Sequence, residues 1–140
     1  MNLLDTDSRG EDWRPLMVSI ALTGRCYKGC QFCYASSVKN GTSGWTYSEL
    51  VDFIVALDRN GVFSVTLGGG EPTLWEDQTA RKTFYDLISE LTERVSLTLT
   101  FTTSGVPKLK LDGIPNIPVR LSCHHPGEAD WVLRTAEDLR

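Results

Sequence analysis

The chain has 140 residues, of which 41% are hydrophobic and 23% are charged, as in an ordinary globular domain. Its net charge of −4 argues against a non-specific nucleic-acid binder, which needs a basic surface. The first 17 residues carry Asp5, Asp7, Glu11 and Asp12 and no long apolar run, which predicts neither a signal peptide nor a membrane span. We therefore expect a cytoplasmic protein without membrane contact, whose clustered thiols are metal ligands or catalytic groups.

The hydrophobic pattern predicts strands that alternate with helices along the chain. Apolar residues at every second position predict four strands, over 17–23, 62–67, 96–102 and 119–123. Helical spacing predicts helices over 47–60 and 79–94, and a last one from about residue 128 onward. Thr46 and Glu49 form a capping box before the first helix, and Gly61 fits the position just past its end. This order indicates an α/β fold with a parallel sheet and right-handed crossovers.

Three of the predicted strands alternate large apolar residues with Ser, Thr or Ala. A parallel strand covered on both faces would instead read as a continuous apolar run. We expect the apolar face, with Phe63, Val65 and Leu67 in the second strand, to pack on the helices. The small polar face would line a cavity that holds something polar. A flat antiparallel sheet with one solvated face is the alternative, which the intervening helices disfavour.

A polar or glycine-rich segment follows each predicted strand. These segments are the loop that begins at Cys26, the GGGEP run 68–72, the TTSG run 102–105, and the HHP run 124–126. In α/β sheets and barrels the chemistry gathers at the carboxyl ends of the strands. We therefore expect the four segments to converge on one site.

Three of the four cysteines fall in one short loop with C-x3-C-x2-C spacing, at Cys26, Cys30 and Cys33. Thiolates are soft ligands suited to iron–sulfur clusters and zinc. A [4Fe–4S] cluster has four irons and normally takes four cysteines. Three cysteines would leave one iron open to bind a substrate or cofactor, as the open position of catalytic zinc does.

Two other interpretations of these cysteines remain open. Cys123, His124 or His125 would supply the fourth ligand of a structural zinc site, although zinc motifs usually contain a second C-x2-C pair. Cys30 and Cys33 alone would form a thiol-redox pair.

The stretch CYKGCQFCY, residues 26–34, resembles the C-x3-C-x-aromatic-C signature of radical S-adenosylmethionine (radical SAM) enzymes, with Phe32 at the aromatic position. A second family motif, GGEP, corresponds to residues 69–72, after the second predicted strand. The wider stretch 15–36 is most similar to members that modify peptides or build small cofactors. The resemblance covers about residues 15–126.

The resemblance implies a partial (βα) barrel of the TIM-barrel type. The family core has six βα units, about 190 residues by analogy with an eight-unit barrel, and this chain has room for about four. We expect an N-terminal extension over 1–15 and an incomplete core over 16–140. The chain would be a compact variant, a fragment of a longer protein, or a chain whose site a second chain completes. An exposed parallel edge favours a homo-oligomer or a partner chain.

The resemblance also implies roles for individual residues. Cys26, Cys30 and Cys33 would hold three irons of the [4Fe–4S] cluster, and SAM would chelate the fourth. Gly69, Gly70 and Glu71 would lie against the methionine amine, because glycines allow close approach and a carboxylate matches an ammonium. The other cofactor-binding residues would be Phe32, Pro72, Thr103, Ser104 and Ser122. Ser104 stands where the family's T-N-G segment has Asn.

The implied activity is reductive cleavage of SAM to methionine and a 5′-deoxyadenosyl radical. The radical then abstracts hydrogen from a substrate, for which a peptide is one candidate. A flavodoxin or ferredoxin would donate the electron. The alternatives are a small activating enzyme of a glycyl-radical protein, a non-catalytic cluster-binding accessory, and a structural zinc module. His124 and His125 would contact substrate, act as acid or base, bind a metal, or be polar residues at the mouth.

Overall fold

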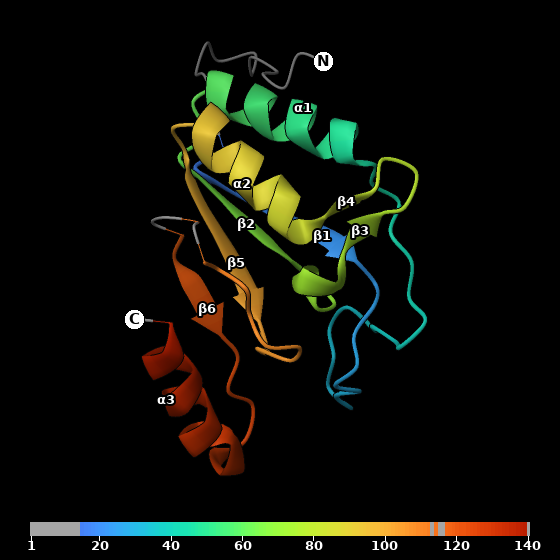
Figure 1. Cartoon of the computed structure of the whole chain (residues 1–140), viewed down its shortest axis with the longest axis vertical. Helices are drawn as coiled ribbons and strands as arrows, with labels where there is room; N and C mark the ends of the chain where they lie inside the picture. Colours follow the sequence, from blue (N-terminus) through green and yellow to red (C-terminus); the bar gives the residue numbers. More distant parts are fainter. Residues whose placement is uncertain (1–14, 113, 115–116, 140) are drawn as a thin grey trace, which may run out of the picture.

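The computed structural model describes residues 15–112, 114 and 117–139 (Figure 1). Its main sheet has four parallel strands in the order β1-β2-β5-β6. These strands are β1 (Met17–Thr23), β2 (Ser64–Gly69), β5 (Thr98–Thr103) and β6 (Val119–Leu121). The predicted α/β class and parallel sheet are confirmed. The predicted extension over 1–15 lies, apart from Pro15, outside the described residues.

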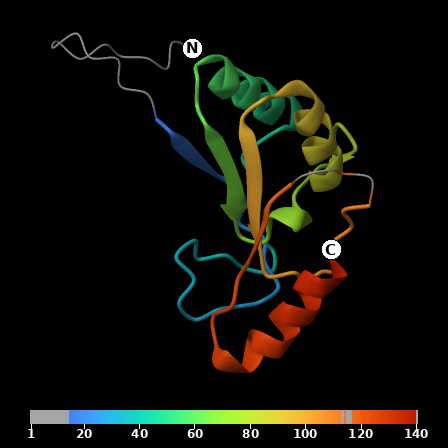
Figure 2. The same cartoon turned by 90° about the vertical axis from the view of Figure 1, so that its left-hand side faces the viewer.

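Helices α1 (Tyr47–Arg59) and α2 (Phe84–Arg94) contact each other and cover the same face of the sheet (Figures 1 and 2). Helix α3 (Ala129–Asp138) lies apart from them, near the C-terminal ends of the strands (Figure 2). It follows a short 3-10 turn, η2 (Pro126–Glu128). No helix in the described part of the chain is long and apolar enough to cross a membrane.

The start of α1 confirms the predicted capping box. The Thr46 side chain accepts a hydrogen bond from the Glu49 N–H, and the Glu49 carboxylate accepts one from the Thr46 N–H at 2.9 Å. The helix ends at Arg59, and Gly61 follows with a positive φ of 78°. Glycine adopts this left-handed conformation without a steric penalty, so the chain can turn into β2.

The second helix starts later than the sequence predicts. Residues 79–83 do not belong to α2, because the two-residue strands β3 (Glu76–Asp77) and β4 (Lys82–Thr83) pair as an antiparallel hairpin. A second capping box starts the helix instead: Asp86 Oδ2 accepts hydrogen bonds from the N–H and hydroxyl of Thr83, each at 2.8 Å. Before the hairpin lies a 3-10 turn, η1 (Pro72–Leu74).

The boundaries of three strands also differ from the prediction. β2 begins two residues later than predicted and runs on to Gly69, because Gly68 and Gly69 pair with Ala21 and Thr23 of β1. β5 begins at Thr98, and β6 is confined to three residues. Phe63 therefore precedes β2, and it is 67% exposed rather than part of the apolar face.

The two faces of the sheet differ as the alternation predicts. The apolar strand residues are buried together with those of α1 and α2; among them are Ile20, Leu22, Val65, Leu67, Leu99, Phe101, Leu50, Ile54, Leu87 and Ile88. On the opposite face Ser19 is in register with Thr66, and Thr66 with Thr100. The two threonine hydroxyls share a hydrogen bond of 2.9 Å. The polar face stays clear of α1 and α2 (Figure 2).

Candidate functional site

The segments that follow the four strands meet in one cavity of about 280 Å³. The loop after β1 contributes Cys26, Lys28, Cys30, Phe32, Cys33, Tyr34 and Ser37. The other lining residues are Gly68, Gly69, Gly70, Glu71, Thr102, Thr103, Ser104, Ser122 and His124. This confirms the predicted convergence at the carboxyl ends of the strands.

The cysteine loop is closed at its base by backbone hydrogen bonds. The Cys26 N–H donates to the Val38 carbonyl, and the Val38 N–H donates to the Gly24 carbonyl, both at 3.0 Å. Between these points the chain turns at Gly29, whose φ is 61°. The loop is therefore anchored at both ends, and its three cysteines lie on the cavity wall.

The three thiols are half-buried and differ in their surroundings. Cys33 Sγ accepts a hydrogen bond from the Ser37 N–H at 3.5 Å, and this bond is the largest cause that lowers the pKa of the Cys33 thiol. Within the described residues, no three His, Cys, Asp or Glu side chains converge on a point that one metal ion could occupy. The thiols share a cavity, which suits a cluster in which each cysteine binds a different iron.

The GGE segment, residues 69–71, contacts the end of β1 and the residues just after it. The Gly70 N–H donates to the Thr23 carbonyl at 2.7 Å, and the Glu71 N–H donates to the Arg25 carbonyl at 2.8 Å. A Cβ atom at position 70 would lie 2.3 Å from the Arg25 carbonyl oxygen, so the contact requires glycine. The sequence predicts glycine here because it allows close approach to the methionine amine of SAM. In the structure, Gly70 also allows close approach to the protein's own backbone at Arg25.

The Glu71 carboxylate is held inside the protein and is only 1% exposed. Oε1 accepts hydrogen bonds from the hydroxyls of Thr73, at 2.8 Å, and Thr103, at 2.6 Å. Oε2 accepts from the backbone N–H of Ser104 at 2.9 Å and from its hydroxyl at 2.8 Å. These four donors fix the carboxylate and join the end of β2 to the end of β5.

The segment after β6 completes the cavity. The Ser122 N–H donates to the Thr103 carbonyl at 2.9 Å, and Ser122 lines the cavity as predicted. The His124 ring meets the Phe32 ring edge-on, with centroids 5.2 Å apart. His125 is absent from the lining, and its Nδ1 accepts a hydrogen bond from the Gly127 N–H at 3.0 Å. Pro72 does not line the cavity either, because it is buried at the start of η1.

Sequence reasoning missed several residues of the site. Tyr34 ends the stretch 26–34 and Gly68 begins the GGGEP run, so both lie within recognised segments but had no assigned role. Thr73 reaches Glu71 only through the η1 turn. Ser37 Oγ is buried and has no hydrogen-bond partner among the described residues. Three soft thiol donors and an unsatisfied hydroxyl around one cavity fit an iron–sulfur cluster with a polar ligand beside it.

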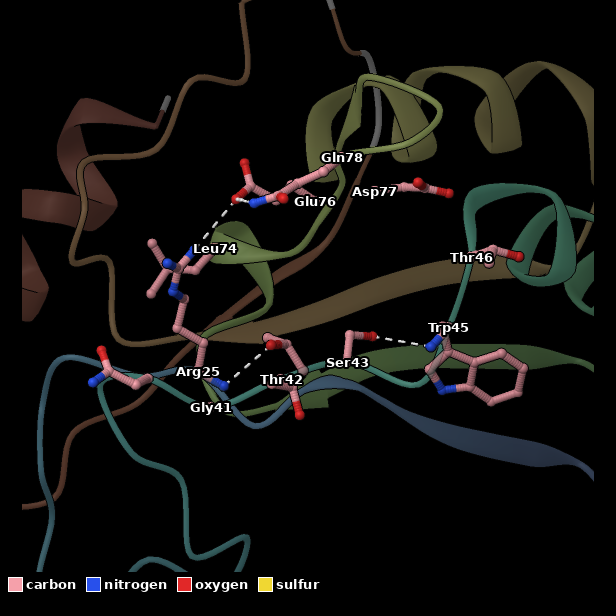
Figure 3. Close-up of a pocket in the computed structure, with 12 residues that line it drawn as sticks. Arg25, Gly41, Thr42, Ser43, Trp45, Thr46, Leu74, Glu76, Asp77 and Gln78 are labelled. Carbon is pink, nitrogen blue, oxygen red and sulfur yellow. Dashed lines mark hydrogen bonds and ion pairs between the residues drawn. The ribbon is translucent and has the colours of Figure 1, made fainter.

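A second cavity, of about 480 Å³, lies between the loop after β1 and the β3–β4 hairpin (Figure 3). Its wall includes Arg25, whose Nη1 lies 3.5 Å from Glu76 Oε1. Asp77 accepts hydrogen bonds there from the N–H groups of Tyr47 and Ala80. The lining contains no cysteine or histidine. The smaller cavity, with all three clustered cysteines, is therefore the candidate site.

Comparisons with known proteins agree with the site. Residues 20–135 match the Radical SAM superfamily. Mycofactocin maturase MftC of Mycolicibacterium smegmatis is 29% identical over 154 residues, which cover 98% of this chain and 37% of that protein. The probable GTP 3',8-cyclase of Pyrococcus horikoshii is 30% identical over 108 residues, which cover 73% of this chain and 33% of that protein.

A third relative is the sporulation killing factor maturation protein SkfB of Bacillus subtilis, 33% identical over 64 residues, or 46% of this chain and 16% of that protein. The aligned part of this chain thus covers between 16% and 37% of the length of these three relatives. Members of the matched family are enzymes that use a [4Fe–4S] cluster and SAM. The family match over most of the chain and the cavity that joins both motifs lead to one conclusion: the chain belongs to the radical SAM superfamily.

Proposed function

We propose that this chain holds a [4Fe–4S] cluster through Cys26, Cys30 and Cys33 and binds SAM beside it. The observation that carries the proposal is the shared cavity, in which the three cysteines lie with the GGE segment, Ser104 and Ser122. When bound, the cluster and SAM supply the chemistry: reductive cleavage to methionine and a 5′-deoxyadenosyl radical that takes hydrogen from a substrate.

The chain's own residues would bind and orient these groups. The hydrogen bond from the Ser37 N–H favours the thiolate form of Cys33, which is the form that binds iron. The backbone at Gly69 and Gly70 and the side chains of Phe32 and Ser122 would contact SAM. Glu71 would support the SAM site indirectly, because both oxygens of its carboxylate already accept hydrogen bonds from Thr73, Thr103 and Ser104.

We propose a peptide as the substrate and a flavodoxin or ferredoxin as the electron donor. Support for a peptide comes from two relatives whose names describe maturation, MftC and SkfB. The competing proposal is a nucleotide substrate, which is supported by the relative named as a GTP cyclase.

We also propose that a second chain, either another copy or a partner, covers the β6 edge. Among the described residues β6 pairs only with β5, so its other edge is unpaired. Apolar residues line a hollow of about 370 Å³ beside it, among them Ile117, Val119 and Leu121. Natural proteins usually cover such edges. A stable monomer in sedimentation that still binds SAM tightly would contradict this proposal.

Anaerobic reconstitution with iron and sulfide tests the main proposal. The wild-type chain should become brown and, once reduced, form 5′-deoxyadenosine from SAM. Cys26→Ala, Cys30→Ala and Cys33→Ala should each lose the cluster absorbance. Cys123→Ala is the matched control, because Cys123 is exposed and does not line the cavity. A chain that binds one zinc and no iron would refute the proposal, and a cluster without SAM cleavage would indicate the accessory role.

A further inference from the structure

Glu128, the last residue of η2, connects two segments with one carboxylate. Its Oε1 lies 2.7 Å from Lys28 Nζ in the cysteine loop, and its Oε2 accepts a hydrogen bond from the His124 N–H at 2.9 Å. The Lys28 and Glu128 side chains are only 23% and 27% exposed. Partial burial and a double role set this pair apart from ordinary surface ion pairs, which contribute little.

A ring contact lies next to this ion pair. His124 and Phe32 meet edge-on, with ring centroids 5.2 Å apart, and both residues line the cysteine cavity. Edge-to-face ring pairs at this distance are attractive. The cysteine loop is thus joined to the chain after β6 at Lys28 and at Phe32, on either side of Cys30.

The same segment also reaches the other wall of the cavity. Trp131, in the first turn of α3, packs so closely on Gly105 that a Cβ atom there would lie 2.6 Å from Trp131 Cη2. Gly105 follows Ser104 and Thr103, which hold the Glu71 carboxylate. One short stretch, residues 124–131, therefore contacts both the cysteine loop and the segment that follows β5.

Apolar packing accounts for only one end of this arrangement. Helix α3 has no fully buried residue, and Leu139, directly after it, packs partly buried against the core. At the other end, residues 124–131 contact the two cavity segments through polar and aromatic side chains. These contacts restrain the loop that carries the cysteines.

We infer that residues 124–131 form a latch that positions the cysteine loop, with Lys28 and Glu128 as its positioning residues. The latch holds the loop against the carboxyl end of β6 and keeps the three thiols on the wall of one cavity. Its benefit to cluster binding rests on the proposed function, but the restraint on the loop does not.

Hydrogen–deuterium exchange of the as-purified chain measures that restraint directly. The reporters are loop amides with backbone hydrogen-bond partners, those of Cys26, Cys33, Ser36 and Val38. Glu128→Lys and Glu128→Gln should speed their exchange about three- to tenfold, the size expected for loss of one partly buried pair. The double variant Lys28→Glu/Glu128→Lys should restore part of the protection, because it re-forms the ion pair but not the bond from the His124 N–H.

Asp138→Lys is the matched control. Asp138 is the last residue of α3, the helix that follows Glu128. Its Oδ2 lies 3.8 Å from Lys108 Nζ, and the Asp138 and Lys108 side chains are well exposed, at 64% and 86%. The charge change equals that of Glu128→Lys, yet loop exchange should stay at the wild-type rate. Unchanged exchange in Glu128→Lys, an equal effect of Asp138→Lys, or no restoration in the double variant would each overturn the latch.

Cluster content gives an independent readout. After identical reconstitution, Glu128→Lys should retain less iron per chain than the Asp138→Lys control. If the wild-type chain takes up no cluster, the proposed function fails, while the exchange data still decide whether the latch exists. If the wild type binds a cluster but the exchange rates of the reporter amides do not change in the Glu128 variants, the latch is wrong and the proposed function stands.

Discussion

Glu71 and Ser104 come from the ends of neighbouring strands, and two hydrogen bonds join them: the Ser104 N–H and hydroxyl both donate to Glu71 Oε2, at 2.9 and 2.8 Å. With the hydroxyls of Thr73 and Thr103, they give a buried carboxylate four donors. A charge can stay buried on these terms because hydrogen bonds replace the water it has lost. The network fixes the floor of the cavity before any ligand binds.

Removal of one donor from this network should measurably lower the free energy of unfolding. Ser104→Ala keeps the backbone donor and loses the hydroxyl, so we expect a loss of about 1–2 kcal/mol in the free energy of unfolding. Glu71→Gln should cost more, about 2–3 kcal/mol, because an amide N–H₂ would face donors instead of accepting from them. Urea unfolding curves measure both changes.

Glu93→Gln serves as the control for Glu71→Gln, because Glu93 is exposed on α2. It should leave the urea midpoint within experimental error. A Glu71→Gln variant as stable as the wild type would show that the four hydrogen bonds do not hold the carboxylate in solution.

The backbone contact at Gly70 gives a second prediction. In Gly70→Ala the new Cβ would lie 2.3 Å from the Arg25 carbonyl oxygen, so the end of β1 and the GGE segment must separate. We expect a loss of about 1–3 kcal/mol, as in other overpacked sites, together with lower cluster uptake. Gly44→Ala is the control, since a Cβ atom there meets nothing within 4 Å. Equal stability of the two variants would contradict this explanation.

The sequence predicts those parts of the molecule whose signals are local. The alternation in 17–23 and the capping box at Thr46 are read from neighbouring residues, and both match the structure. Convergence of the cysteine loop and the GGE segment follows from a general rule of parallel sheets, so the sequence is enough to predict where the site lies.

Contacts that depend on short or distant partners could not be predicted. The strands β3 and β4 have two residues each, which is too few for any periodicity. The helix predicted over 79–94 therefore includes β4, and β3 is not predicted at all. The bond from Thr73 to Glu71 depends on the η1 turn, and the Lys28–Glu128 pair joins residues far apart in the chain. Such pairs become visible only when the fold brings them together.

The capping box of α2 predicts a pH dependence. The Thr83 N–H, followed by its hydroxyl, lowers the pKa of Asp86 below its ordinary value. The folded state therefore binds the proton less readily than the unfolded state. The stabilisation is present above the ordinary aspartate pKa, about 3.9, and is lost as the pH falls through the lower folded pKa.

Asp86→Asn removes this titration and keeps an oxygen acceptor. The wild type should be more stable than the variant at pH 6, and the difference should shrink towards pH 3. Unfolding free energies from urea curves at both pH values test it, and because other carboxylates titrate in both proteins, only the difference reports Asp86. A difference that grows as the pH falls would contradict the assigned sign.

The hydrogen bond between Thr66 and Thr100 tests the polar face of the sheet. Thr100→Val removes one partner and leaves the Thr66 hydroxyl unpaired on a half-buried surface, so we expect a loss of about 1 kcal/mol. Replacing both threonines with valine should cost less than the sum of the single changes, because no hydroxyl is left unsatisfied. Thr98→Val, at an exposed position of the same strand, controls for the strand preference of valine. Strictly additive losses in urea unfolding would show that the two hydroxyls act independently of each other.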